Sequence, residues 1–190
     1  EAINAAGTWN LPIVFVINNN RWAISLPQNK QTHAQTLAQK AIAAGIAGEQ
    51  VDGNDVIALY SRIEKAIAKA RSTAGPTVIE ALTYRLCDHT TADDASRYRS
   101  PEELQEHWMY EPIIRLKHYL SQQGYWSETD ENLLQEQTQA KVDIAVDEYL
   151  NTPAQPPESM FDYLYATLPD TLIEQRRSVM NPIMTKGSEK

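Results

Sequence analysis

The sequence contains one cysteine, no long apolar run and no excess of basic residues, and each shortage excludes a class of protein. The single cysteine, Cys87, rules out an internal disulfide and is typical of a reducing compartment. The longest wholly apolar stretch, residues 11–17, is far too short to cross a membrane. With 17 Lys and Arg against 25 Asp and Glu, the net charge of -8 argues against duplex nucleic acid as a partner, because such binding needs a basic face.

Common catalytic motifs are missing as well. The sequence has no glycine-rich dinucleotide or phosphate-binding loop and no G-x-S-x-G. One cysteine, with no pair of histidines at ligand spacing, leaves no zinc site. There are no repeats and no low-complexity segments, and 42% hydrophobic residues predict a globular fold. The chain opens at Glu1 in what looks like the middle of a helix, so we expect residues upstream of it.

The first hundred residues alternate between strand and helix patterns. A β-branched apolar run at 12–17 predicts a strand buried on both faces, which stops at Asn18. A small-residue helix at 37–44 is closed by Gly45, and a short strand follows at 50–51. Asn54 or Asp55 caps the next helix, and residues 77–84 predict another strand. This order predicts the α/β fold class, with a parallel sheet of which only part is present.

The remainder of the chain predicts helices. We expect helices at 102–108, at 112–123 and from about 127, with a last helical turn or two at 160–165. The expected organisation is therefore an α/β domain at 1–100, a helical region at 101–180 and a loose tail at 181–190.

Two polar segments follow predicted strands, at residues 18–25 and 85–99. The carboxyl ends of parallel strands meet at one edge of a sheet, where ligands bind, so the two segments can converge on one ligand.

Each segment has two interpretations. The asparagines at 18–20 suit a tight turn, or an amide oxygen that is a ligand of Mg²⁺. The second segment suits a solvated run of ion pairs between Asp93, Asp94, Arg97 and Arg99, or a pocket in which His89 and arginines face an anionic substrate. Cys87 and His89 also fit a nucleophile and its base, although such pairs are usually assembled from distant parts of a sequence.

Several motifs in a fixed order decide between these interpretations. They are VINNNRWAIS at 16–25, VDGNDV at 51–56, IEALTYR at 79–85, HTTADD at 89–94 and RYR at 97–99. Together with residues 37–46, they resemble the α subunits of thiamine-diphosphate-dependent 2-oxoacid dehydrogenases, over residues 1 to about 177.

The resemblance implies roles for individual residues. Asn20 gives its side-chain oxygen, and Trp22 its backbone carbonyl, to a Mg²⁺ ion that holds thiamine diphosphate. The remaining ligand of the family, the Asp of a Gly-Asp-Gly segment, would lie before Glu1. His89 resembles the active-site histidine near the cofactor. The network that orders its loop comprises Tyr84, Arg85, Asp93, Tyr98 and Arg99.

Two positions depart from the family pattern. Thr90 stands where regulated animal enzymes carry a phosphorylated serine, which puts kinase control in doubt. Cys87-Asp88 stands where relatives often have Gly or Pro.

The implied reaction is oxidative decarboxylation of a 2-oxoacid, with transfer of the acyl group to the lipoyl arm of a dihydrolipoyl transacylase. Residues 31–32 and 36–41 resemble the pyruvate enzymes of the family more closely, which implies pyruvate as the substrate. The implied partner is a β subunit in an α2β2 heterotetramer, which supplies the glutamate that activates the cofactor. The implied location is the bacterial cytoplasm, or the mitochondrial matrix in a eukaryote. Two alternatives stay open: the same chemistry on branched-chain 2-oxoacids, and a non-catalytic fragment that only contacts a β subunit.

Overall fold

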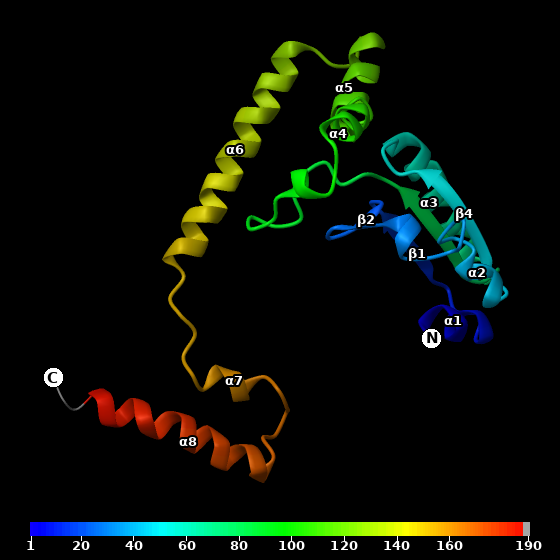
Figure 1. The fold of residues 1–190 in the computed structure, drawn as a ribbon. Coiled ribbons are helices and arrows are strands. Elements are labelled where there is room, and N and C mark those ends of the chain that lie inside the picture. Colours follow the sequence, from blue (N-terminus) through cyan, green and yellow to red (C-terminus); the bar gives the residue numbers. More distant parts are fainter. Residues whose placement is uncertain (188–190) are drawn as a thin grey trace. The chain divides into compact units, whose positions relative to one another are not determined.

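The computed structural model describes residues 1–187, with side chains up to residue 181 (Figure 1). The chain forms two compact units, Glu1–Glu128 and Thr129–Lys190, and each is described by itself.

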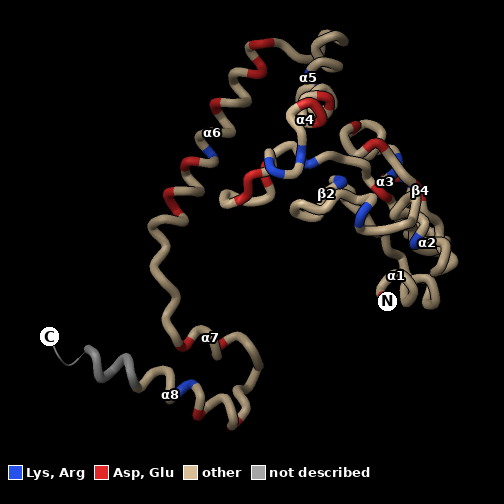
Figure 2. The backbone as a smooth tube through the Cα atoms, viewed as in Figure 1, with Lys and Arg blue, Asp and Glu red and all other residues tan. Residues whose placement is uncertain are grey.

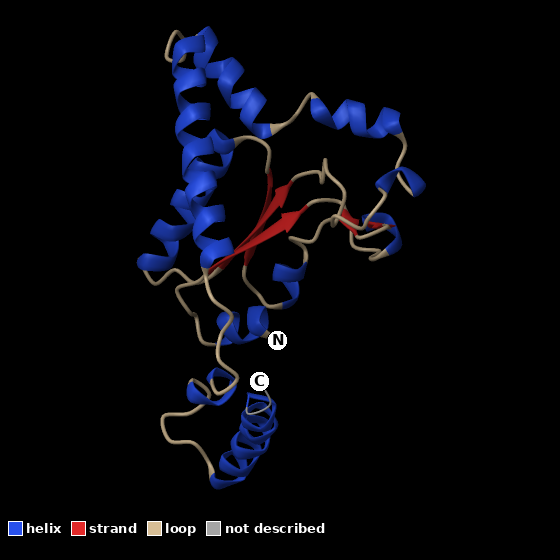
Figure 3. Ribbon diagram, turned by 90° about the vertical axis from the view of Figure 1, so that its left-hand side faces the viewer, coloured by secondary structure: helices blue, strands red, loops and turns tan. Residues whose placement is uncertain are grey.

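The first unit is built on a parallel sheet of three strands (Figure 3). The strands β1 (Val14–Asn19), β5 (Thr77–Leu82) and β4 (Ala47–Asp52) lie in the order β1-β5-β4. The register pairs Thr77 with both Val14 and Ala47, so all three strands run in step and end at the same edge. The parallel α/β fold expected from the sequence is confirmed.

Helices connect the strands. Helix α1 (Ala2–Thr8) precedes β1, α2 (Lys40–Ala43) precedes β4, and α3 (Val56–Arg71) leads from β4 to β5. The core lies between α3 and the sheet, because Val51, Ile79 and Ala81 of the strands are buried together with Ala66 of the helix. Strand β5 lies between β1 and β4, which are the edges of the sheet, and β5 is the most buried element.

Strand β1 differs from expectation in two ways. It continues through Asn18 and Asn19, which pair with Ala81 and Leu82 of β5. It is also not buried on both faces, since Val16 is 52% exposed. The exposure follows from its place at the edge of the sheet, and the extension follows from its pairing with β5, which is equally long.

The helix boundaries agree in part with the sequence patterns. Asp55 caps α3 as expected, since its side chain accepts from the backbone N–H groups of Ile57 and Ala58 at 3.0 Å. Helix α2 is shorter than expected and begins at Lys40, but Gly45 follows it with φ +68°, the left-handed conformation that ends many helices.

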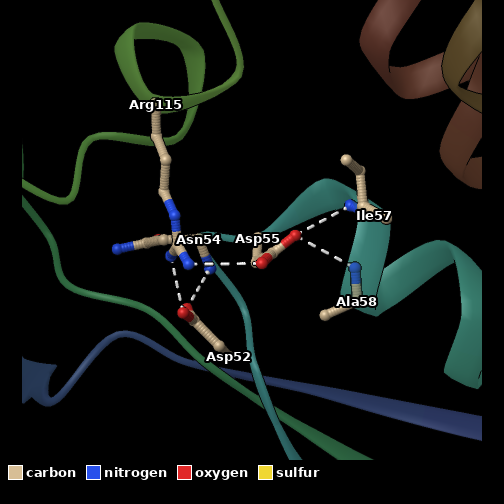
Figure 4. A network of polar contacts seen from close by, with 6 residues as sticks. All are labelled: Asp52, Asn54, Asp55, Ile57, Ala58 and Arg115. Atoms are coloured by element: carbon tan, nitrogen blue, oxygen red, sulfur yellow. Dashed lines mark hydrogen bonds and ion pairs between the residues drawn. The ribbon is translucent and has the colours of Figure 1, made fainter. Parts of the chain in front are cut away.

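Two helices beyond residue 100 also belong to the first unit, namely α4 (Pro101–Trp108) and α5 (Pro112–Gln122). The unit thus extends past the boundary expected at residue 100. Figure 4 shows one reason: Arg115 of α5 forms ion pairs with Asp52 at 2.6 Å and with Asp55 at 3.2 Å. In addition, the ring of His107 in α4 stacks on Tyr84, with centroids 3.6 Å apart.

The second unit is helical. It contains the helices α6 (Glu128–Asn151), α7 (Ser159–Asp162) and α8 (Asp170–Gly187). The first residue of α6, Glu128, is assigned to the first unit. Acidic residues recur along α6 (Figure 2). Among the described residues, no helix has the length and hydropathy needed to span a membrane.

The prediction of a loose tail at 181–190 is wrong for residues 181–187, because helix α8 continues to Gly187. The helix begins with Asp170, whose charge suits a helix N-terminus, and contains Leu172 and Gln175, which favour helix. The expectation of a tail rested only on the place of these residues at the end of the chain. Residues 188–190 of the expected tail lie outside the described residues.

Candidate functional site

The ends of β1 and β5 form one polar edge, as the sequence suggested. After β5 ends, the backbone N–H of Thr83 donates to the backbone carbonyl of Asn19 at 3.0 Å. The backbone N–H of Arg85 donates to the backbone carbonyl of Asn20 at 3.2 Å. The Thr83 hydroxyl also donates to the Asn18 side chain at 2.6 Å. The two polar segments therefore leave the sheet side by side.

The asparagine cluster forms a tight turn. Asn19 Oδ1 accepts from the backbone N–H of Arg21, and Asn20 Oδ1 accepts from that of Trp22, both at 3.1 Å. These consecutive bonds hold Arg21 at φ +70°. The turn leads into a small hairpin of β2 (Trp22–Ala23) and β3 (Leu26–Pro27), followed by a short 3₁₀ helix, Gln28–Lys30.

Two cavities adjoin this turn. One, of about 320 Å³, is lined by Asn20 and Trp22 together with Lys40 at the start of α2. The other, of about 620 Å³, shares Trp22 and is also lined by Tyr84, Glu103, His33 and His107. The sequence did not predict Lys40 as a residue of this cavity, because its position in a helical pattern does not show that it lies near the asparagines.

The segment after β5 is held by a chain of contacts centred on Arg85. Its Nη2 donates to the Tyr98 hydroxyl at 2.8 Å and to the carbonyl of Ile24, in the β2–β3 hairpin, at 2.7 Å. The Tyr98 hydroxyl donates to Asp93 Oδ2 at 2.5 Å, and the same oxygen accepts from the backbone N–H of His89 at 2.8 Å.

Arg99 fixes the beginning of the same segment. Its guanidinium is buried and donates to the backbone carbonyls of Arg85 and Leu86. It also lies 5.7 Å from the centroid of the Tyr84 ring, whose hydroxyl donates to Glu103 at 2.7 Å. The structure thus brings together the five residues expected to order the loop: Tyr84, Arg85, Asp93, Tyr98 and Arg99.

The ion pairs expected between the arginines and aspartates of this segment do not form. Asp93 instead binds the Tyr98 hydroxyl, and Asp94 accepts from the backbone and hydroxyl of Ser96, at 3.2 and 2.6 Å. Arg99 is 6% exposed, and a buried guanidinium needs acceptors, which nearby carbonyls supply. Spacing along the sequence could not show that Arg99 turns inward.

These contacts change the acidity of two side chains. The hydrogen bond from Tyr98 and the backbone N–H of His89 lower the pKa of Asp93. Desolvation and the hydrogen bond to Asp93 raise the pKa of Tyr98. The Asp93–Tyr98 pair is therefore held in the form in which the carboxylate is charged and the phenol is neutral.

His89 lines neither of the two cavities described above, and it is exposed. Cys87 is exposed too, and no contact joins it to His89 in the described part of the chain, which leaves the nucleophile interpretation without support. Within that part, no group of three or more His, Cys, Asp or Glu side chains could hold a metal ion.

Comparison with known proteins identifies the class. The family model described as the dehydrogenase E1 component matches residues 1–158, and the chain belongs to that family. The family uses thiamine diphosphate, in agreement with the resemblance found in the motifs.

The individual relatives are more specific. Proteins named pyruvate dehydrogenase E1 component subunit alpha, from Staphylococcus epidermidis and Staphylococcus aureus, are 45% and 44% identical to this chain over 176 residues. The matches cover 92% of this chain and 48% of each relative, so the chain spans about half the length of these relatives.

Proposed function

We propose that this chain is part of the α subunit of a pyruvate dehydrogenase E1 component. Its reaction is oxidative decarboxylation of pyruvate, with transfer of the acetyl group to the lipoyl arm of a dihydrolipoyl transacetylase. The observation that carries this proposal is the 45% identity to a protein of that name along 92% of the chain. The matched region includes the polar edge where β1 and β5 end.

The residues at this edge fit the cofactor. Thiamine diphosphate, when bound, supplies the electron sink for decarboxylation. The side-chain oxygen of Asn20 and the backbone carbonyl of Trp22 are hard neutral donors of the kind that Mg²⁺ accepts. Asn20 Oδ1 uses one lone pair for the N–H of Trp22 and keeps a second. Lys40 lines the same cavity and brings positive charge that suits a diphosphate.

The loop after β5 has a different role. The Arg85–Tyr98–Asp93 chain of hydrogen bonds holds the backbone of His89, while its side chain stays exposed. An imidazole can exchange a proton near neutral pH, so His89 is the residue that we assign to proton transfer at the reacting centre.

The assembly follows from the same assignment. We expect a β subunit to complete the cofactor site in an α2β2 heterotetramer and to contribute the glutamate that activates the cofactor. Exposed apolar residues in the first unit, including Ile24 and Leu26 of the hairpin, are available for such a contact. A lipoyl-bearing transacetylase is the expected acceptor of the acetyl group.

The test is a comparison of substrates. The full-length subunit, assembled with its β subunit and loaded with thiamine diphosphate and Mg²⁺, is given pyruvate or 3-methyl-2-oxobutanoate, and release of carbon dioxide is measured. We expect the higher kcat/KM with pyruvate. A preference for the branched acid would assign the enzyme to the branched-chain class, and no release from either would leave a non-catalytic subunit.

A further inference from the structure

A charged residue lies at the centre of the sheet. Glu80, in the middle of β5, is fully buried, and its neighbours along the strand are apolar. Within the described part of the chain it forms no ion pair. A buried carboxylate is costly unless its oxygens accept enough hydrogen bonds, so its contacts identify what it stabilises.

Three hydrogen bonds satisfy Glu80. Its Oε1 accepts from Asn19 Nδ2 at 2.7 Å, while Oε2 accepts from the backbone N–H of Ala38 at 2.8 Å and from Gln50 Nε2 at 3.0 Å. The donors come from the end of β1, the segment before α2, and β4. Gly48 in β4 permits one of these approaches, because a Cβ there would lie 2.6 Å from the carbonyl oxygen of Ala38.

Asn19 connects this carboxylate to the turn. It is only 5% exposed, and its amide nitrogen also donates to Gln28 Oε1 at 3.0 Å. Its oxygen accepts from the N–H of Arg21, the residue at φ +70°. The orientation of one buried amide therefore sets the backbone on which Asn20 and Trp22 lie.

The alternative is a purely structural role. A buried polar group seldom gives more stability than an apolar side chain of similar size, so stability alone is a weak reason for a glutamate here. The contacts of Glu80 also converge on one place. Asn19, Asn20 and Trp22 line the cavity of about 320 Å³, and so do Leu37 and Lys40, close in sequence to Ala38.

We propose that Glu80 is a positioning residue: through Asn19 it sets the turn that presents Asn20 and Trp22 to the metal and diphosphate of the cofactor. This inference rests on the proposed function. Glu80 does not touch the cofactor, and it acts by fixing which way the Asn19 amide faces.

Exchanging the amide and the carboxylate between positions 19 and 80 tests this contact. In Glu80→Gln, the new amide keeps one oxygen for Ala38 and Gln50, but its NH₂ faces the NH₂ of Asn19. If the Asn19 amide rotates to relieve this, its oxygen leaves the N–H of Arg21. In the Glu80→Gln/Asn19→Asp double variant, a carboxylate at position 19 accepts from both the new amide and Arg21, and the formal charge is unchanged. The Gln28 amide, which loses its donor at position 19, can turn its NH₂ towards the new carboxylate.

The experiment uses the full-length subunit assembled with its β subunit and stripped of cofactor. Thiamine diphosphate is titrated calorimetrically at several Mg²⁺ concentrations, and kcat is measured at saturating levels of both. We expect Glu80→Gln to weaken binding by about 10-fold or more, the usual effect of losing support for a metal ligand. The double variant should recover most of this affinity, and kcat at saturation should change little.

The matched control is Gln50→Leu. It removes another hydrogen bond to the same carboxylate but leaves Asn19 in place, so we expect a lower melting temperature with unchanged cofactor affinity. Equal losses of affinity in Gln50→Leu and Glu80→Gln would overturn the proposal, as would a double variant no better than Glu80→Gln. If Glu80→Gln does not assemble, Asn19→Ala takes its place, and unchanged affinity in that variant overturns the proposal.

One further variant separates this inference from the function on which it rests. Asn20→Ala removes the proposed metal ligand itself. If it leaves Mg²⁺-dependent binding unchanged, the proposed metal site is wrong. If it weakens binding while Glu80→Gln does not, only the positioning role of Glu80 is wrong.

Discussion

His89 combines an exposed side chain with a fixed backbone, because its N–H donates to Asp93 at 2.8 Å. We expect His89→Ala, in the full-length α–β assembly, to lower turnover by about 100-fold, the low end for a lost acid–base group. Cofactor affinity should change little, since the proposed ligands Asn20 and Trp22 lie on another segment. Rapid-mixing measurements should follow decarboxylation and acetyl transfer to a lipoyl domain separately, because histidine can serve either step.

Cys87→Ala is the matched control for this measurement. Cys87 is exposed on the same loop, two residues from His89, and has no assigned role. Its loss should leave both rates unchanged. Unaltered rates in His89→Ala as well would contradict the catalytic role of His89.

The bond between Tyr98 and Asp93 makes the loop sensitive to acid. Tyr98 lowers the pKa of Asp93 in the folded protein, so this contribution to stability is present above the unfolded pKa, near 3.9, and is lost as the pH falls through the lower folded value. Tyr98→Phe should raise the pKa of Asp93 towards its ordinary value.

Carboxyl NMR titration measures this shift, and exchange of the His89 amide proton reports whether the loop opens at a higher pH. Ser96→Ala is a suitable control, because the Ser96 hydroxyl binds Asp94 instead. An unchanged pKa of Asp93 in Tyr98→Phe would show that the hydrogen bond does not set it.

At the scale of elements, Arg115 links helix α5 to the junction between β4 and α3. Arg115 pairs with both Asp52, the last residue of β4, and Asp55, the N-cap of α3, and the bond to Asp52 raises the pKa of Arg115 (Figure 4). Because the guanidinium is partly exposed, we expect Arg115→Ala to reduce the free energy of unfolding by only about 1 kcal/mol. The loss should shrink at high salt.

Urea denaturation of the full-length subunit at two salt concentrations provides the measurement. The control is Arg62→Ala, since Arg62 forms a single, longer ion pair of 3.6 Å with Glu49. If the two variants lose equal stability at low salt, the contacts of Arg115 do not attach α5 more strongly than an ordinary surface pair.

The sequence predicted the elements that depend on local patterns. The strands of the parallel sheet, Asp55 as one of two candidate caps and the stop at Gly45 were predicted because periodicity, capping and glycine conformation act over a few residues. The β2–β3 hairpin was not predicted. Helix α8 was not predicted as an element of its own: residues 170–180 fell within the expected helical region, but its last residues fell within the expected tail.

Contacts between distant residues were beyond such patterns. The sequence indicated that residues 18–25 and 85–99 share an edge, but not that Arg99 binds carbonyls or that Glu80 binds Asn19, 61 residues away. The one available signal for Glu80 was a charged residue inside an otherwise apolar strand. Burying such a residue costs free energy unless it is hydrogen-bonded, but its partners lie far away in the sequence and cannot be read from the local pattern.

At the scale of the whole molecule, we expect the 190-residue chain alone to bind thiamine diphosphate and Mg²⁺ poorly. Only Asn20 and Trp22 are proposed here as oxygen ligands, whereas Mg²⁺ requires near-octahedral coordination. The chain also spans 48% of its relatives, and the cofactor site is proposed to be shared with a β subunit. Calorimetric titration of the chain and of the α–β assembly compares the two, and equal affinities would contradict this expectation.

We propose that the turn after β1 carries a ligand of the cofactor's metal, and substitutions of Asn18 and Asn20 test this claim. Asn20→Ala and Asn18→Ala are each made in the full-length α–β assembly, and binding of thiamine diphosphate is measured calorimetrically as Mg²⁺ is varied. The Asn18 side chain accepts from the Thr83 hydroxyl and lines the same cavity, but it is not a proposed ligand, so its loss should have little effect on binding. We expect Asn20→Ala to weaken Mg²⁺-dependent binding far more, and equal losses in both variants would contradict the claim.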